Sequence, residues 1–71
     1  MIRDVVISKE PIELHKLLKF ESLVASGGEA KQVIAEGLVL VNGAVETQRR
    51  KKIVSGDVVA LGDEKIRIQL G

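Results

Sequence analysis

A hairpin turn at Asn42-Gly43 constrains the fold of this chain more than any other feature. Asn-Gly is the strongest signal for a two-residue type I′ turn, whose twist matches that of paired antiparallel strands. An apolar run over residues 38–41 precedes the turn and residues 44–46 follow it, so these two segments are expected to pair. The second half of the chain therefore begins with an antiparallel hairpin.

The rest of the second half also predicts strands. Turn sequences at residues 55–57 (Ser-Gly-Asp) and 62–63 (Gly-Asp) bound an apolar run over residues 58–61. From Lys65 to Leu70 apolar and polar residues alternate, with the isoleucines on one side and the charged residues on the other. A period of two residues is typical of a strand with one buried face.

The first half predicts a short strand and a first helix. Val5 and Ile7 lie on one face of a strand over residues 3–8. Pro11 fits the position just before or within the first turn of a helix. Leucines then follow at helical spacing, which predicts a helix of about two turns ending near Phe20; these leucines are Leu14, Leu17 and Leu18.

A second helix is indicated by signals at both of its ends. Ser26 with Glu29 three residues later forms a capping box, which places Ser26 at the N-cap. Gly37 ends the helix, because the left-handed conformation after a helix favours glycine. The apolar stripe between these ends consists of Ala30, Val33 and Ile34.

These elements give the order β-α-α-β-β-β-β, an α+β fold with two short helices packed on a small antiparallel sheet. A chain of 71 residues is long enough for one domain, so residues 1–71 are expected to form a single unit. Phe20 is the only aromatic residue. The core is therefore expected to be aliphatic, with Phe20 contributing to it.

Catalytic chemistry finds little support in the composition. The chain has no cysteine, which excludes disulfides, thiolate metal sites and cysteine nucleophiles. His15 is the only histidine and has no matched nucleophile or carboxylate pair, so it is expected to be a solvent-facing or half-buried helix residue. We expect no enzyme activity, no metal, no cofactor and no small-molecule substrate.

The N-terminal apolar run is short. It comprises residues 5–7 and is followed by Lys9 and Glu10, which suits neither a signal peptide nor a membrane span. We therefore expect a cytoplasmic protein without a membrane partner. The oligomeric state stays open, with a monomer favoured.

Four consecutive cations form the most distinctive polar segment, here called the basic run: Arg49, Arg50, Lys51 and Lys52. The net charge is only +1, so this concentration of charge indicates a localised anionic partner. A solvated loop is the alternative. Lys16 and Lys19 on the first helix and Lys31 on the second lie away from the apolar stripes, and would converge with the basic run if the helices pack together on the sheet.

The start of the second helix is a further candidate. Free N–H groups at a helix N-terminus attract phosphate, and Gly27 and Gly28 would allow a close approach. In the alternative, Ser26 and Glu29 cap this end internally and the Glu29 carboxylate repels an anion. The sequence supports both interpretations.

Residues 29–43 (EAKQVIAEGLVLVNG) resemble the RNA-binding domain of small-subunit ribosomal protein S4. The helix, its glycine stop, the Val-x-Val strand and the Asn-Gly turn carry the resemblance, as does Gly56-Asp57 downstream. It covers roughly residues 10–60, and residues 35–37 and 43–47 are similar to short, stand-alone bacterial YbcJ-type members. The resemblance implies an αL RNA-binding motif, made of two helices and the following hairpin, with RNA along the second helix.

On that basis the RNA face would hold Ser26, Gly27, Gly28 and Lys31, with the basic run beside them. The family often has Arg where this chain has Gly27 and a basic residue where it has Leu40. The basic run would offset that loss of charge.

The class of RNA follows from the shortage of aromatic residues. Readers of single-stranded RNA stack bases on aromatic rings, and a buried Phe20 would leave no such platform. The remaining contacts are to phosphates, 2′-hydroxyls and shape, so we expect structured RNA, ribosomal RNA first and tRNA second. The alternative is a protein-interaction module whose basic run meets an acidic protein partner.

Overall fold

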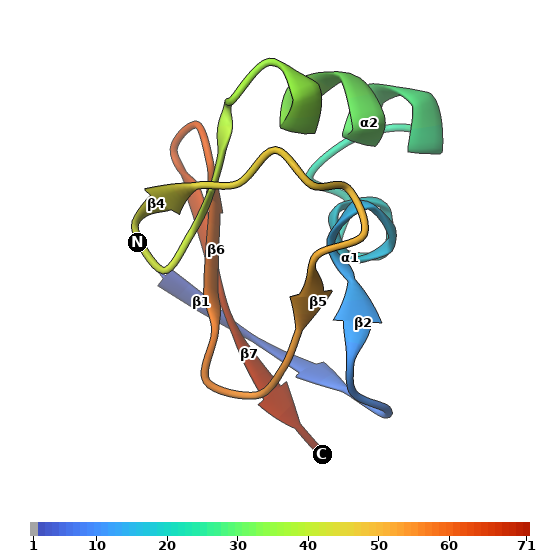
Figure 1. Cartoon of the computed structure of the whole chain (residues 1–71). Coiled ribbons are helices and arrows are strands. Elements are labelled where there is room, and N and C mark those ends of the chain that lie inside the picture. Colours follow the sequence, from blue (N-terminus) through green and yellow to red (C-terminus); the bar gives the residue numbers. More distant parts are fainter. Residues whose placement is uncertain (1) are drawn as a thin grey trace.

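The computed structural model describes residues 2–71, which form two helices and seven strands (Figure 1). In chain order these are β1 (Ile2–Ile7), β2 (Ile12–Glu13), α1 (Leu14–Phe20), α2 (Gly27–Ala35), β3 (Val39–Val41), β4 (Ala44–Val45), β5 (Lys52–Ile53), β6 (Val58–Leu61) and β7 (Glu64–Leu70).

Five of the strands form one sheet in the order β1-β7-β6-β3-β4, and both helices lie on one side of it (Figure 1). The predicted α+β fold with two helices is therefore confirmed. The sheet is mixed, however, because β1 runs parallel to β7, with Val5 opposite Ile68. The remaining pairs of this sheet are antiparallel. A second, two-stranded sheet joins β2 to β5, and neither of these strands was expected.

The hairpin at Asn42-Gly43 has the predicted geometry. Asn42 has φ 53° and Gly43 has φ 85°, as a type I′ turn requires. The Asn42 side chain also fastens the hairpin to the next strand. Its Oδ1 accepts a hydrogen bond from Val58 N–H at 2.9 Å, and its Nδ2 donates to Asp57 Oδ1 at 3.0 Å.

Helix α1 begins later than Pro11 suggested. The extended pair Ile12–Glu13 forms β2 first, and the helix starts at Leu14. Glu13 occupies the N-cap position without a capping hydrogen bond from its side chain. The expectation for Pro11 was wrong in this respect, because pairing of β2 with β5 delays the helix.

Helix α2 follows its sequence signals closely. Ser26 Oγ accepts a hydrogen bond from Glu29 N–H at 3.1 Å, which confirms Ser26 as the N-cap. Glu29 Oε1 in turn accepts from Ala25 N–H, one residue before the cap. Gly37 has φ +75°, the left-handed conformation expected after the helix.

The core lies between the helices and the sheet and is aliphatic, as expected. It includes fully buried side chains from α1, α2 and four strands, among them Leu17, Ile34, Ile53 and Ile68. Phe20 does not belong to it: the residue is 69% exposed at the end of α1. The prediction that Phe20 lies in the core is therefore wrong.

Candidate nucleic-acid interface

The basic run is attached to the start of α1 through its backbone. Arg49 O accepts a hydrogen bond from His15 N–H at 3.0 Å, and Lys51 O accepts from Leu14 N–H at 2.9 Å. The first N–H groups of a helix have no partner within the helix, so these two carbonyls take the place of a side-chain cap. A turn closed by Lys51 N–H to Gln48 O, at 3.1 Å, places Arg49 and Arg50 at its tip.

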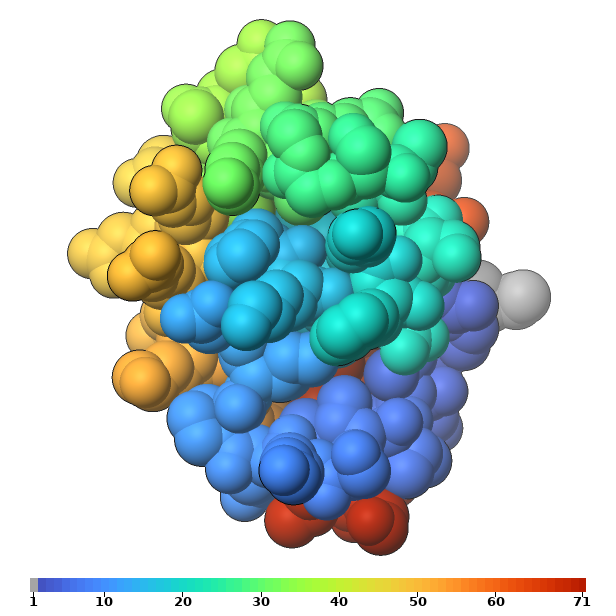
Figure 2. Space-filling view, turned by 90° about the vertical axis from the view of Figure 1, so that its right-hand side faces the viewer, coloured from blue at the N-terminus to red at the C-terminus, as the bar shows by residue number. Residues whose placement is uncertain are grey.

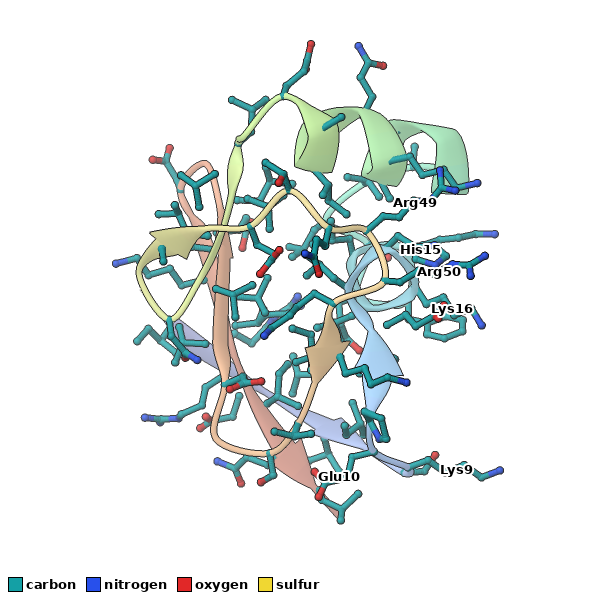
Figure 3. All side chains as sticks on the ribbon, in the orientation of Figure 1. Lys9, Glu10, His15, Lys16, Arg49 and Arg50 are labelled. Atoms are coloured by element: carbon teal, nitrogen blue, oxygen red, sulfur yellow. The ribbon has the colours of Figure 1, made fainter. Side chains whose placement is uncertain are left out.

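Arg49 and Arg50 project from this tip on the same side of the molecule as Lys16 (Figure 3). All three residues are exposed. In the space-filling view of this side, α1 occupies the centre, α2 lies above it and the basic run lies at one edge (Figure 2). Lys16 of α1 and the first half of the basic run thus share one side of the molecule, whereas the convergence of Lys31 with them stays a prediction. We call Lys16, Arg49 and Arg50, together with Lys19 one turn after Lys16 on α1, the cationic face.

One carboxylate lies among these cations. Glu13 Oε1 is 3.0 Å from His15 Nε2 and 3.7 Å from Lys16 Nζ. The hydrogen bond with His15 holds the pKa of Glu13 below its ordinary value, and the nearby charges of Lys16 and Arg50 act in the same direction. Glu13 therefore stays ionised and partly neutralises the cationic face. His15 itself is half-buried on α1, within the range expected for it.

The second half of the basic run has acidic neighbours. Lys51 and Lys52 line a groove of about 400 Å³ bounded by residues of β3, β4 and the segments around β5. Glu46 and Asp57 line the same groove, so two carboxylates accompany the two lysines. The two halves of the basic run thus have different surroundings: its arginines project beside α1, whereas its lysines share a groove with acidic residues, and Lys52 also lies opposite Glu13 in the pairing of β2 with β5.

The residues predicted on the helices are all accessible or partly so. Lys19 and Lys31 are exposed on α1 and α2. At the start of α2, Ser26 and Gly28 are exposed and Gly27 is half-buried, and a side chain at Gly27 would meet open space. The Glu29 carboxylate caps this same end of the helix. Internal capping is thus confirmed here, and phosphate contact by Gly27 and Gly28 stays a prediction.

Phe20 is a candidate contact residue that the sequence analysis wrongly placed in the core. Together with Lys9, Ile12 and Leu17 it lines a second groove, of about 350 Å³, between the end of β1 and α1. The helical spacing contained a signal for its exposure. At 100° per residue, Phe20 lies about 110° from the centre of the stripe formed by the buried leucines.

In the part of the chain that the structure describes, residues 2–71, no three His, Asp or Glu side chains come together as candidate metal ligands. Neither of its helices is long and apolar enough to cross a membrane.

Comparison with known proteins places these features in context. The S4 domain family matches residues 5–69. "Putative RNA-binding protein YbcJ" of Escherichia coli (strain K12) is 46% identical over 63 residues, which cover 87% of this chain and 90% of the relative. "Probable ribosome maturation protein RlbA" of Bacillus subtilis (strain 168) is 38% identical over 61 residues, which cover 86% of each chain.

The fold has a similar counterpart of known structure. The solution structure of E. coli YbcJ, described as revealing an αL motif involved in RNA binding, superimposes with a TM-score of 0.71. The two sequences are 43% identical in this comparison, and the alignment covers 93% of this chain and 85% of YbcJ.

Proposed function

Because this chain belongs to the S4 domain family, we propose that it is a non-catalytic module that binds structured RNA through its cationic face. The observation that carries the proposal is the attachment of the basic run to α1. Two backbone hydrogen bonds hold Arg49 and Arg50 on the side of the molecule where Lys16 projects. Cations that are fixed before binding lose less conformational freedom when they meet an anion.

Phosphate oxygens are the groups that this face suits. Arginine forks bind phosphate with two parallel hydrogen bonds, and lysine adds a mobile point charge. Such contacts position a protein on RNA without reading its sequence. Recognition would then depend on the spacing of phosphates in a folded RNA, supplemented by contacts to 2′-hydroxyls.

Ribosomal RNA is the first candidate and tRNA the second. The names of two relatives support this order: one is described as an RNA-binding protein and the other as a ribosome maturation protein. We propose that Ser26, Gly27, Gly28 and Lys31 lie along the bound RNA, and that Lys51 and Lys52 contribute to its long-range attraction. The two carboxylates in their groove give the two lysines the weaker role.

Titration of the protein with RNA at several salt concentrations tests the proposal. Neutralisation of about four phosphates predicts a slope of about −3 in a plot of log affinity against log salt concentration. A ribosomal RNA fragment should bind more tightly than tRNA, and both should bind more tightly than an unstructured oligonucleotide of equal length.

A charge-reversal variant locates the site. Arg49→Glu with Arg50→Glu should weaken binding at least about 100-fold, because attraction becomes repulsion at two phosphates. Its melting temperature should change little, since exposed charges contribute about 0–1 kcal/mol each. Lys65→Glu on β7 is the matched control and should bind normally. A parent protein that binds no RNA would instead favour an acidic protein partner, and RNA binding without salt dependence would refute contact through phosphates.

A further inference from the structure

The chain builds its core from aliphatic residues alone and places its single aromatic ring on the surface. Phe20 is 69% exposed at the C-terminal end of α1. An exposed phenyl ring gains little from the hydrophobic effect in the free protein, because most of its apolar area stays in water. Its position therefore contributes little to folding and is available for contact with a partner.

The ring borders a hollow rather than a flat surface. The groove it lines is about 350 Å³ in volume and lies between the end of β1 and α1. Figure 2 shows this hollow between the segment around Ser8 and Lys9 and the helix. Ile12 and Leu17 provide further apolar lining, and Leu17 is fully buried beneath it. The groove thus offers one accessible ring beside an apolar wall.

Cations flank the ring on both sides. Lys16 precedes Phe20 by four residues on α1, so the two side chains lie on the same face of the helix, and Lys16 belongs to the cationic face. Across the groove, Lys9 is exposed and projects on the same side of the molecule as Lys16 (Figure 3). Glu21 is the one carboxylate that lines the groove, and its backbone oxygen accepts a hydrogen bond from Arg3 at 3.3 Å.

We propose that Phe20 is a stacking platform for an unpaired base of the bound RNA, and that Lys9 and Lys16 hold the phosphates on either side of that base. This inference rests on the proposed RNA-binding function and specifies its ligand. A flat ring with a cation at each side complements a nucleotide, in which a flat base hangs between two phosphates. Stacking on an aromatic side chain is tolerant of base identity, since every base has a π face.

A base stacked on Phe20 requires a narrower class of RNA than the structured RNA expected from the sequence. A continuous duplex offers no free base, because its bases are stacked on one another. The ligand would instead be a folded RNA with a bulged or looped nucleotide next to a helical segment, so that the cationic face holds the helix while Phe20 takes the unpaired base.

Two RNA hairpins that differ by a single bulged nucleotide test this ligand. The parent protein should bind the bulged hairpin about 5- to 100-fold more tightly than the fully paired one, the range expected for one stacked base. Phe20→Leu should lose this preference but keep the parent's affinity and salt slope for the paired hairpin. Val45→Ala, at a residue that is 58% exposed on β4, is the control and should keep the preference.

Phe20→Trp provides an independent readout. The chain contains no Trp or Tyr, so this variant has a single indole fluorophore at the proposed platform. It should retain the preference for the bulged hairpin, and its fluorescence should be quenched by that hairpin but not by the paired one. Retained preference in Phe20→Leu, or unchanged fluorescence in Phe20→Trp, would overturn the inference.

Different binding results would refute base stacking on Phe20 and RNA binding itself. Equal binding of both hairpins by the parent would refute stacking and leave phosphate-driven binding in place. Binding of neither hairpin by the parent would refute both proposals. Because Phe20 is largely exposed, Phe20→Leu is expected to melt at the parent's temperature, and a thermal melt checks that the variant is folded.

Discussion

The two halves of the basic run carry the same charge and adjoin one another in the sequence, yet their surroundings differ. Arg49 and Arg50 lie at the tip of a turn and project beside α1 (Figure 3). Lys51 and Lys52 line a groove that also contains two carboxylates. A run of like charges therefore predicts a local excess of charge but not the surroundings of each charge, because the course of the backbone decides where each side chain points.

Ile53 determines the direction in which the neighbouring Lys52 side chain points. It follows Lys52 in β5, is fully buried and pairs with Ile12 of β2. Successive side chains of a strand point to opposite faces, so burial of Ile53 forces Lys52 outward. At the other end of the basic run, hydrogen bonds from N–H groups of α1 to the carbonyls of Arg49 and Lys51 fix the positions of Arg49 and Arg50.

Truncation of Ile53 is expected to have the largest effect, because this side chain holds the basic run against the core. Ile53→Ala should lower the free energy of unfolding by about 2–5 kcal/mol, because it leaves a cavity in the core beneath the basic run. Chemical denaturation measures the change. The neighbouring Val54→Ala is the matched control: Val54 is 40% exposed, and its loss should cost less than about 1 kcal/mol. Equal losses in the two variants would mean that Ile53 does not anchor the segment.

The salt dependence of RNA binding measures how much each half of the basic run contributes. Each phosphate contact adds about 0.7–0.9 to the magnitude of the slope. Arg49→Gln with Arg50→Gln should therefore reduce the magnitude by about 1.5. Lys51→Gln with Lys52→Gln removes the same formal charge but should reduce it by less than about 0.5, because the carboxylates of Glu46 and Asp57 line the same groove and weaken its attraction for phosphate.

The two double variants also serve as controls for each other. Both remove two positive charges from adjacent positions, so a general loss of attraction would affect them equally. Equal reductions of the slope would show that the whole basic run acts as one surface on RNA. A larger reduction for the lysine pair would move the RNA site to the groove beside β4.

Local sequence signals were sufficient where the structure is determined by near neighbours. The Asn42-Gly43 turn and the ends of α2 were predicted because each depends on residues only a few positions apart. The conformations at Asn42, Gly43 and Gly37 confirm this. The resemblance of residues 29–43 to the S4 domain is confirmed by the family match, which spans residues 5–69.

Features that depend on distant segments escaped prediction. The parallel pairing of β1 with β7 joins Val5 to Ile68, and no local signal marks it. The two-residue strands β2 and β5 are too short to show a period. The contrast within the basic run arises from that same pairing together with the backbone contacts to α1, so it too was invisible in the sequence. Phe20 was predicted to lie in the core because of its residue type, although its helical spacing places it away from the stripe of buried leucines.

Substitution of Glu13 is expected to have the smallest effect on RNA affinity. It tests whether the carboxylate beside the cationic face weakens RNA binding. Glu13→Gln keeps a polar group beside His15 but removes the negative charge near Lys16 and Arg50. RNA affinity should rise about two- to fivefold at pH 7, which corresponds to the small contribution of an exposed charge pair. Parallel RNA titrations of the parent and the variant measure this gain.

The pH dependence of that gain identifies its cause. The pKa of Glu13 is held below its ordinary value of 4.5, chiefly by the hydrogen bond with His15, so the parent carboxylate stays charged at neutral pH. As the pH falls through this lowered pKa, the parent loses the charge and any stability that the charge contributes, whereas the variant has neither to lose. The affinities of the two proteins should therefore converge only as the pH falls through this lowered pKa, which lies below 4.5. Glu64→Gln on β7, away from the cationic face, should bind like the parent at every pH. A gain that persists in acid would have to come from a change in shape rather than charge.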